Sequence, residues 1–484
     1  MKKRILSLLL IACAAVAVFG FAGCKKKSGK ISEYEIFASY DSESRTLTGA
    51  VDFTFFNSTD NELGELKFNL YGNAFRENAL HKPVSSSYEG RAFYAGKSYG
   101  GMTVDSVENC TNWNVTGEDE NILNVTLSQP VYPDQSVKLK INYKLTLAQI
   151  NHRTGVTANA VNLGNFYPVL CAYTKEGFIE APYYHCGDPF VSECANYKVT
   201  IDMPAAYTAA ASGKLVSETT ASDRKKCTYS LDNARDFALV LSDKFEVISG
   251  DVNGVEVSYY YYSDDDAQKS LAAACESVEY FSETFGGYVY PTLSVVQTGF
   301  CYGGMEYPAL TMIADDVKGD ENIYTIVHEN AHQWWYAMVG SDQLNCGWQD
   351  EGLAEYSSVM FFETHPDYAF TRLGLVGSAT KAYRAFYSVY NQIFGETDTS
   401  MNRNLSQYES EYEYSNIAYN KGMIMFDLLR QSIGDDKFVS CLKKYYKENL
   451  YKIASCDDLF GCFISSGSDL EGFFDAFIEG KIVI

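Results

Sequence analysis

The chain of 484 residues contains only six histidines and no pair of cysteines in a CxxC arrangement. Its thirteen cysteines are scattered, which argues against a zinc ribbon or a thioredoxin-like redox motif. Positive charge is also scarce, because 39 Lys and Arg residues stand against 62 Asp and Glu residues and leave a net charge of −23. A protein this acidic would repel a polyanion, so we expect no nucleic-acid partner.

The amino-terminal residues form a targeting segment rather than part of a fold. A basic start at residues 2–4 precedes an apolar run from Ile5 to Phe21, as in a secretory signal. The run ends in FAGC, which resembles the lipobox of bacterial lipoproteins. The resemblance implies a signal peptide over residues 1–23, lipidation at Cys24 and an exported, membrane-attached protein. An uncleaved anchor helix is the alternative, and residues 24–30 would in either case be a polar tether.

The rest of the chain falls into two parts with different hydrophobic periodicity. From residue 31 to 262, alternating and β-branched segments stand between Asn, Asp, Gly and Pro, which predicts an antiparallel β-saddle or sandwich. Residues 263–484 contain one short β-rich piece and otherwise show helical spacing. After that piece, helices are expected near residues 322–339, 349–364, 371–394, 416–433, 435–449 and 469–479. The sequence therefore predicts a multidomain protein, a β-domain followed by an α-rich domain.

Two of the six histidines lie in the stretch TIVHENAHQWW, where they form an HExxH motif. His328 and His332 are four residues apart, so a helix would place both side chains on one face, about 5–6 Å apart at Cβ. Two imidazoles on one face can bind one zinc ion, and Glu329 between them can take a proton from a water molecule. The alternative is a core helix whose histidines are merely hydrogen-bonded, but that arrangement does not require the glutamate.

A catalytic zinc ion needs a third protein ligand, and the stretch CGWQDEGLAEY provides candidates. Glu351 lies nineteen residues after His332, near the start of the next predicted helix. A helical hairpin would bring Glu351 back against the two histidines. Asp350 and Glu355 are competing carboxylates that the spacing alone leaves open.

Together, these motifs resemble those of a known enzyme family. HExxH followed by eighteen residues and a glutamate, preceded by GGMEYP and followed by YNKG, is similar to the gluzincin aminopeptidases of the aminopeptidase N family. The resemblance extends from about residue 31 to the last residue. It implies an amino-terminal β-saddle followed by a thermolysin-like zinc peptidase domain. We expect a short form that lacks the carboxy-terminal domains of longer relatives.

The resemblance also implies roles for individual residues. His328, His332 and Glu351 would bind one Zn²⁺ ion per chain, and Glu329 would be the general base of peptide hydrolysis. Tyr419 of YNKG would donate a hydrogen bond to the oxyanion, since a phenol with an ordinary pKa near 10 stays protonated.

Other residues would bind the substrate. Glu306 would bind the α-amine of the substrate, and Gly303, Gly304 and Met305 would form the strand along which the substrate lies. The second amine-binding residue is expected near residues 165–170, NFYPVL.

Three further tyrosines and one asparagine qualify this interpretation. Tyr412 and Tyr414 are alternatives to Tyr419 as the oxyanion donor. Tyr307 and Asn330 replace residues usual in the family, although neither replacement removes a group that hydrolysis requires.

The sequence thus predicts a metalloaminopeptidase whose substrates are peptides with a free amino terminus. Two alternatives stay open at this stage. The same zinc site could belong to an endopeptidase, or the chain could be a peptide- or glycan-binding surface lipoprotein without catalytic activity.

Overall fold

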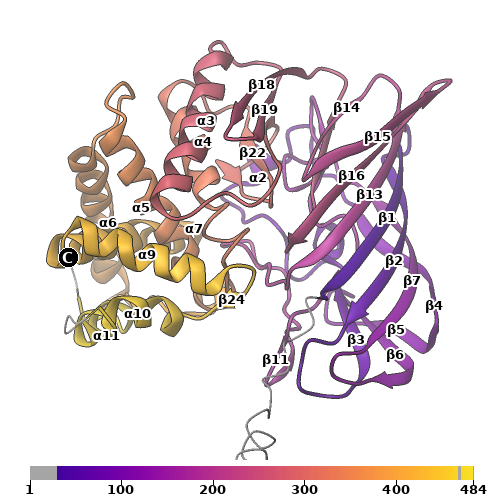
Figure 1. Cartoon of the computed structure of the whole chain (residues 1–484), viewed down its shortest axis with the longest axis horizontal. Helices are drawn as coiled ribbons and strands as arrows, with labels where there is room; N and C mark the ends of the chain where they lie inside the picture. The colour runs from indigo at the N-terminus through magenta and orange to yellow at the C-terminus, as the bar shows by residue number, and fades with distance from the viewer. Residues whose placement is uncertain (1–29, 467–469, 483–484) are drawn as a thin grey trace, which may run out of the picture.

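The computed structural model describes residues 30–466 and 470–482. Strands make up the part of the molecule on the right of Figure 1, and helices make up the part on the left. The predicted signal peptide, the lipidation site Cys24 and most of the tether lie outside the described residues.

A seven-stranded sheet dominates the amino-terminal part. Its spatial order is β15 (Lys214–Ala221), β16 (Arg224–Ala234), β13 (Ala195–Pro204), β1 (Ser32–Asp41), β2 (Thr46–Phe56), β7 (Ser136–Thr146) and β4 (Gly101–Glu108). The sheet is antiparallel, as expected, except that β1 and β13 run parallel. Parallel neighbours need a long crossover, and the chain between these two strands supplies one four-stranded sheet and half of another.

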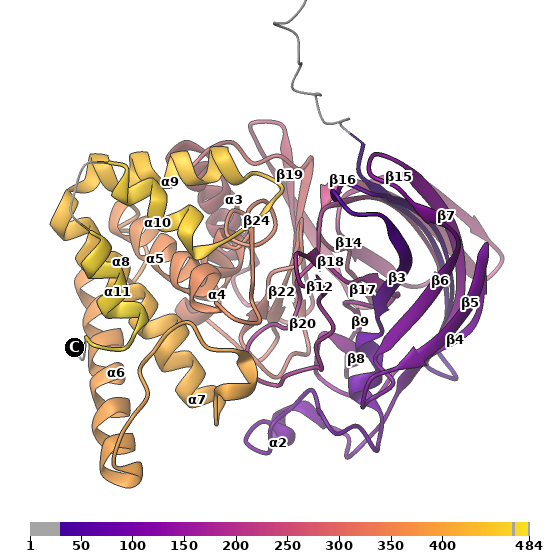
Figure 2. The same cartoon turned by 90° about the horizontal axis from the view of Figure 1, so that it is seen from below.

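Two four-stranded sheets complete the β-rich part. One contains β10 (Val169–Leu170), β3 (Leu63–Asn69), β6 (Ile122–Val131) and β5 (Cys110–Thr116) in that order. The other contains β14 (Thr208–Ala211), β17 (Leu239–Ser242), β9 (Val161–Leu163) and β8 (Thr154–Val156). Along the chain, short elements connect these strands: η1 (Tyr71–Phe75), α2 (Glu89–Ala92), β11 (Tyr173–Thr174) and β12 (Gly177–Phe178). Figure 2 shows how strongly the large sheet curves, as expected of twisted strands.

A five-stranded sheet joins the β-rich part to the helices. Its order is β18 (Glu246–Val252), β19 (Val255–Tyr261), β20 (Thr292–Thr298), β22 (Leu310–Ala314) and β21 (Gly304–Met305). Strands β18 and β19 precede residue 262, the boundary expected from the sequence, yet β19 pairs with β20 beyond it. This pairing favours a domain boundary near residue 245.

The remaining elements are mostly helices. They are α3 (Ala267–Thr284), α4 (Asp320–Ala331), α5 (Trp348–Thr364), α6 (Arg372–Phe394), η2 (Leu405–Gln407), α7 (Glu411–Tyr414), η3 (Ser415–Lys421), α8 (Gly422–Ile433), α9 (Asp435–Asn449), α10 (Cys456–Ile464) and α11 (Glu471–Ile478). A two-stranded ladder, β23 (Gly340–Ser341) with β24 (Ile453–Ala454), ties the segment after α4 to the segment after α9.

Two helices differ from the sequence expectation in ways that affect the site. The helix expected to end near residue 339 ends at Ala331, and His332 is its capping residue. Wide turns follow, in which the N–H of Ala337 donates to the carbonyl of His332. The helix expected over 416–433 begins as a π-helical segment, η3, which contains Tyr419. Such π-helical turns are rare overall, and those that occur often lie at functional sites.

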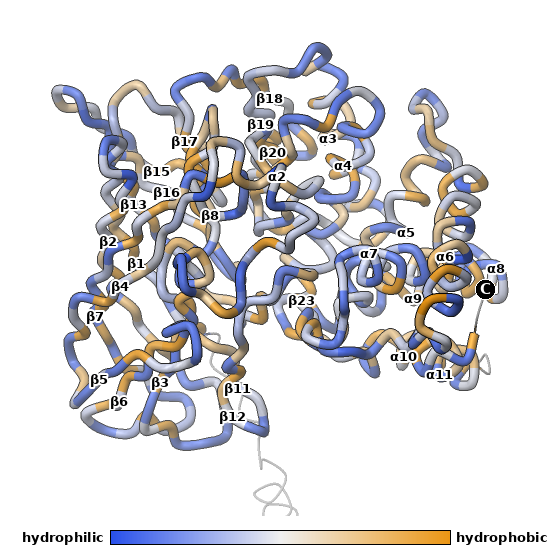
Figure 3. Tube along the Cα trace, turned by 180° about the vertical axis from the view of Figure 1, so that it is seen from behind, coloured by the Kyte–Doolittle hydropathy of each residue, from blue (hydrophilic) through white to orange (hydrophobic). Residues whose placement is uncertain are grey.

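Apolar residues of both parts contribute to one continuous core, which includes strands of the large sheet as well as α4, α5 and α8. Figure 3 shows hydrophobic and hydrophilic residues alternating along most strands and helices, the pattern of elements with one buried face. Among the described residues, no helix combines the length and apolar character required to span a membrane.

Candidate active site

The two histidines of the HExxH motif and Glu351 form one buried cluster. Nε2 of His332 lies 3.2 Å from Nε2 of His328 and 3.2 Å from Oε2 of Glu351. Nε2 of His328 lies 3.4 Å from the same oxygen. The three potential ligand atoms therefore converge, and all three residues are buried.

The other ring nitrogens have different neighbours. Nδ1 of His332 lies 3.1 Å from the carbonyl oxygen of Trp335, and Nδ1 of His328 lies 3.5 Å from Oε1 of Glu355. The carbonyl of Trp335 fixes the tautomer of His332 and leaves its Nε2 free for a metal ion. Nδ1 of His328 makes no hydrogen bond among the described residues, and Glu355 is an acidic neighbour rather than a hydrogen-bonded partner. The carbonyl of Trp335 belongs to the wide turn after α4, so the early end of the helix places a hydrogen-bond partner beside His332.

The structure separates Glu351 from the two carboxylates that competed with it in the sequence. Glu355 faces the outer nitrogen of His328 and accepts a hydrogen bond from Tyr324, so it lies beside a ligand. Asp350 accepts a hydrogen bond from Gln343 Nε2 at 2.6 Å. Of the three, Glu351 is the carboxylate that approaches both histidines at Nε2.

The residues fit a zinc ion. Ligand atoms 2.0–2.1 Å from a tetrahedral ion are separated by about 3.3–3.4 Å, and the three observed separations are 3.2, 3.2 and 3.4 Å. Two imidazoles and one carboxylate are also a typical donor set of catalytic zinc. Buried carboxylates outnumber cations here, so a divalent ion would reduce an unfavourable concentration of negative charge.

Glu329 points at the space in front of this cluster. Its Oε2 is buried and has no hydrogen-bond partner among the described residues. Gly304 on β21 makes room for the carboxylate, because a Cβ at this position would lie 2.3 Å from Oε1 of Glu329. The Glu329 carboxylate thus requires a glycine at position 304, whereas the sequence suggested only the approach of a substrate. Gly303 has more space, with Thr325 at 3.9 Å from an added Cβ.

Burial and neighbouring charges shift the pKa values of these carboxyls in opposite directions. Burial raises the pKa of Glu329 to about 7, although the two histidines oppose the shift. Burial would also raise the pKa of Glu351, but His332 and His328 lower it to about 2. Glu351 is thus held ionised as a ligand requires, and Glu329 can take up and release a proton near neutral pH.

A second group of polar residues lies beside the metal cluster and forms what we call the amine end. Its first member is Glu306, which follows Met305 of β21 and is 3% exposed. Ligand atoms of Glu306, His332 and Asp350 lie within 4.8 Å of one another. Gln343 Nε2 is 3.4 Å from Oε1 of Glu306. Burial raises the pKa of Glu306 well above its ordinary value, and a bound ammonium would reverse that shift.

Asp188 and Arg153 are members of the amine end that the sequence did not reveal. Their side chains form a buried ion pair, and Arg153 also donates to Tyr183 OH at 2.8 Å and to Met305 Sδ at 2.9 Å. Asp188 lines the cavity in front of the cluster, together with Tyr419. No local pattern marks either residue, because the pair joins positions 35 residues apart through tertiary packing.

Residues 165–170, where a second amine-binding residue was expected, form the wall behind the amine end. Asn165 accepts a hydrogen bond from Tyr307 OH at 2.7 Å and donates one to Asp236 at 2.6 Å. Tyr167 OH donates to the other oxygen of Asp236 at 2.7 Å. Tyr307, which replaces the asparagine usual in the family, is therefore satisfied by this wall. Asn330, the other residue that departs from the family pattern, is also hydrogen-bonded, because its side-chain amide donates to Ser277 Oγ of α3 at 2.9 Å.

Tyr419 contacts the metal cluster from the π-helical segment η3. Its phenol donates to Oε1 of Glu351, and its ring stacks on His328 with centroids 5.9 Å apart. The close crossing of α5 and α8 brings it there, since a Cβ on Gly422 would lie 2.8 Å from Cα of Gly352. Tyr412 is exposed, and Tyr414 packs edge-on against the ring of Tyr419.

A cavity of about 230 Å³ leads from the surface to these residues. Its lining includes Gly303, Gly304 and Tyr419 from the catalytic part and Arg153 and Asp188 from the β-rich part. The cavity thus lies at the junction of the two parts, beside Gly304 and Tyr419, which adjoin Glu329 and Glu351 respectively.

Comparisons with known proteins agree with this architecture. Residues 269–477 match the model of the peptidase family M1 domain. The chain is 25% identical over 245 residues to human endoplasmic reticulum aminopeptidase 2, a match that covers 46% of this chain and 24% of that protein. The chain thus spans less than two thirds of the length of this relative.

Solved structures match over almost the whole chain. A crystal structure of an M1 zinc metallopeptidase from Deinococcus radiodurans superposes with a TM-score of 0.67 at 18% identity, covering 94% of each chain. A variant of an M1 zinc metallopeptidase from the same organism, bound to a Tyr-Ser-Ala substrate, gives a TM-score of 0.64 at 17% identity over 94% of this chain and 95% of that chain. The two-part fold, a β-rich part followed by an α-rich peptidase part, is therefore shared with these structures.

Proposed function

Because residues 269–477 of this chain are a peptidase family M1 domain, we propose that the protein is a zinc peptidase that releases amino-terminal residues from peptides. The observation that carries the proposal is the short distance between the metal cluster and the amine end, since ligand atoms of Glu306 and His332 lie within 4.8 Å of each other. In a peptide, the α-amine nitrogen is about 2.5 Å from its own carbonyl carbon. An ammonium held by Glu306 would therefore present the first peptide bond to the metal cluster.

The metal would be held by His328, His332 and Glu351. Zinc bound there would supply Lewis acidity, which activates water and polarises the carbonyl of the scissile bond. The protein residues then divide the remaining work. Glu329 takes the proton of the attacking water and returns it to the leaving amine, a role suited to a pKa of about 7.

Tyr419 and the amine end stabilise the reacting peptide on its two sides. The phenol of Tyr419 donates to Glu351 in the structure described here and can donate instead to a carbonyl oxygen that develops negative charge. Burial raises its pKa further, so the phenol keeps its proton. Glu306, with Asp188 nearby in the cavity wall, provides the negative charge that an ammonium requires.

Peptides with a free amino terminus are the proposed substrates. Support comes from the named activity of the human relative, an aminopeptidase, and from the related structure bound to a Tyr-Ser-Ala substrate. The cavity of about 230 Å³ leaves room for a few peptide atoms at a time.

The test is hydrolysis of one short peptide in two forms, with its amino end free and acetylated, each with and without a zinc chelator. We expect cleavage of the free form alone, abolished by the chelator. Glu306→Ala should raise KM for the free form, by about 10-fold or more if a charge-assisted contact of 1.5–3 kcal/mol is lost.

The other outcomes would identify the alternatives. Chelator-sensitive cleavage of both forms would make the protein an endopeptidase on the same metal site. Cleavage of neither form by zinc-loaded protein would favour a peptide- or glycan-binding protein without catalytic activity.

We also propose that the protein is exported and held at a membrane by a lipid on Cys24. The basic start, the apolar run and the FAGC sequence support this location. Metabolic labelling with a fatty-acid analogue in a bacterial host would test it. The wild type should incorporate label and Cys24→Ser should not, whereas equal labelling of both would contradict lipidation at this residue.

A further inference from the structure

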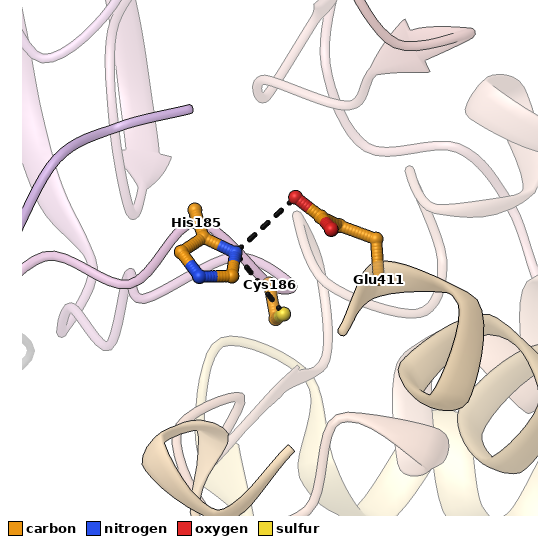
Figure 4. Close-up of side chains that lie close together, drawn as sticks. All are labelled: His185, Cys186 and Glu411. Carbon is orange, nitrogen blue, oxygen red and sulfur yellow. Dashed lines mark hydrogen bonds and ion pairs between the residues drawn. The ribbon is translucent and has the colours of Figure 1, made fainter. Parts of the chain in front are cut away.

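A second group of metal-binding side chains lies near the mouth of the cavity. Figure 4 shows one imidazole nitrogen of His185 facing the side chains of both Cys186 and Glu411. Nδ1 of His185 lies 3.2 Å from Oε1 of Glu411 and 3.3 Å from Sγ of Cys186. His185 and Cys186 precede β13 in the β-rich part, whereas Glu411 is the first residue of α7. The group therefore spans the two parts of the molecule.

Hydrogen bonding alone does not satisfy this group. One imidazole nitrogen carries at most one hydrogen, so Nδ1 cannot donate fully to both the carboxylate and the sulfur. Oε1 of Glu411 is buried, and it accepts no hydrogen bond of ordinary geometry from the described residues. Nδ1 of His185 thus faces a carboxylate oxygen and a sulfur but can form a full hydrogen bond with only one of them, and Oε1 of Glu411 is left without a partner of ordinary geometry.

Neighbouring cations do not compensate for Glu411 either. Two arginines line the same cavity, but Arg91 is paired with Asp316 and Arg153 is paired with Asp188. The carboxylate of Glu411 instead faces His185, with Oε1 3.2 Å from Nδ1. A cation between Glu411 and His185 would therefore gain both charge and ligands.

The chemistry of the three side chains selects the class of cation. Imidazole nitrogen, thiolate sulfur and carboxylate oxygen together suit zinc and similar borderline ions, whereas magnesium and calcium prefer oxygen alone. Around a tetrahedral zinc ion, such atoms are about 3.3–3.6 Å apart, close to the observed 3.2 and 3.3 Å. Cys186 is 2% exposed, and burial raises the pKa of its thiol to about 12, so an incoming ion must displace the proton.

We propose that His185, Cys186 and Glu411 bind a second zinc ion, separate from the catalytic one. The side chain of His185 is 38% exposed, which gives the ion access from the cavity and leaves a fourth position for water. An ion there would fix α7 to the β-rich part across the cavity that Tyr419 and Gly303 also line. Resting on the proposed function, we infer that this ion inhibits peptide hydrolysis by restricting entry.

Metal stoichiometry tests the site without reference to activity. The full-length protein is dialysed against Zn²⁺ in excess, and bound zinc is measured by mass spectrometry. We expect two zinc ions per chain in the wild type and one in Cys186→Ser and Glu411→Gln. Cys110→Ser is the matched control, because Cys110 is a free, partly exposed cysteine on β5, and it should retain two.

Cobalt provides a spectroscopic check on the sulfur ligand. Co²⁺ added to protein that holds one zinc ion should produce a thiolate-to-cobalt charge-transfer band, present in Cys110→Ser and absent in Cys186→Ser. One zinc ion per chain in the wild type, or two in both Cys186→Ser and Glu411→Gln, would overturn the site. Glu411→Gln preserves the size of the side chain, so loss of the second ion there does not depend on the folding of the cysteine variant.

Activity tests the inhibitory role. Each protein is compared with its own rate at one zinc ion per chain, using a peptide with a free amino terminus. We expect excess zinc to lower kcat/KM of the wild type at least 10-fold and to leave Cys186→Ser at its initial rate. Equal inhibition of both would overturn the inhibitory role, whereas two bound ions in a protein without hydrolysis would leave the site intact and reject the peptidase instead.

Discussion

The metal cluster and the amine end lie side by side, but they are built in different ways. The cluster comes from two consecutive helices, α4 and α5, and helical spacing brings its two histidines to one face. The amine end is assembled from β21, the loops around Arg153 and Asp188, and the segment that contains Gln343. The cluster is therefore a local product of the chain, whereas the amine end depends on how the β-rich part packs against the catalytic part.

This contrast implies different costs for changing the two regions. Residues of the metal cluster are specialised for chemistry, so we expect their substitution to reduce activity more than stability. Arg153 of the amine end contacts Met305 of β21, so we expect its substitution to reduce stability more than activity.

The largest effect should come from Glu329→Gln at the metal cluster. Loss of the general base should lower kcat about 100- to 10,000-fold. Zinc should stay bound, because His328, His332 and Glu351 are unchanged. Stability should not fall, since burial already raises the pKa of Glu329 to about 7 and disfavours its charge. The checks are peptide hydrolysis, zinc content and urea unfolding.

Glu321→Gln is the matched control for this variant. Glu321 is an exposed residue in the first turn of the same helix, α4, and should tolerate the change without loss of activity. If Glu329→Gln hydrolysed peptides at the rate of this control, Glu329 would not be the base.

At the amine end, Arg153→Met should mainly reduce stability. It leaves Asp188 buried without its partner, a change that typically costs about 3–5 kcal/mol. Arg91→Met is the control, because Arg91 lines the same cavity but its ion pair with Asp316 is exposed and should contribute at most about 1 kcal/mol. Urea unfolding of both variants measures the difference, and equal losses would contradict a stabilising role for the buried pair.

The wall behind the amine end should respond to pH through Asp236. Burial raises its pKa to about 7, from an ordinary value of about 3.9 in the unfolded chain. Well below pH 4 the carboxyl of Asp236 is protonated in both the folded and the unfolded chain, so the stability that depends on the neutral carboxyl is fully present. As pH rises through 7, the unfolded chain loses the proton first, and up to about 4 kcal/mol of stability should be lost.

Asp236→Asn isolates this contribution. The variant lacks the ionisable group, so its free energy of unfolding should depend less on pH between 4 and 7 than that of the wild type. Unfolding in urea at several pH values provides the comparison. Parallel pH profiles of the two proteins would contradict a raised pKa at Asp236.

The same contrast explains how much of the site could be predicted from the sequence. His328, His332 and Glu329 were predictable because helical periodicity converts spacing into geometry. The two-part fold was predictable because strands and helices have different hydrophobic periods. The pairing of β19 with β20 across the expected boundary at residue 262 was not.

Residues placed by tertiary packing escaped prediction. Arg153 and Asp188 meet across 35 residues, and an arginine and an aspartate in loops look like surface residues until the fold buries them. Gly304 was expected to face substrate, but its contact with Glu329 depends on where α4 lies against β21. The choice among Asp350, Glu351 and Glu355 was also open, because spacing along a helix does not fix which carboxylate faces the neighbouring helix.

The smallest effect should come from a change at Glu355. Of the three carboxylates, Glu355 is the one that lies beside the outer nitrogen of His328. Glu355 lies 3.5 Å from Nδ1 of His328 and is itself held by Tyr324. Glu355→Gln should weaken zinc binding about 10- to 100-fold, as loss of such an acidic neighbour usually does, while zinc-saturated protein keeps most of its kcat. Competition with a chelator measures the affinity. A variant that held zinc as tightly as the wild type would mean that the cluster is fixed by α4 and α5 alone, and the contrast with the amine end would then be sharper.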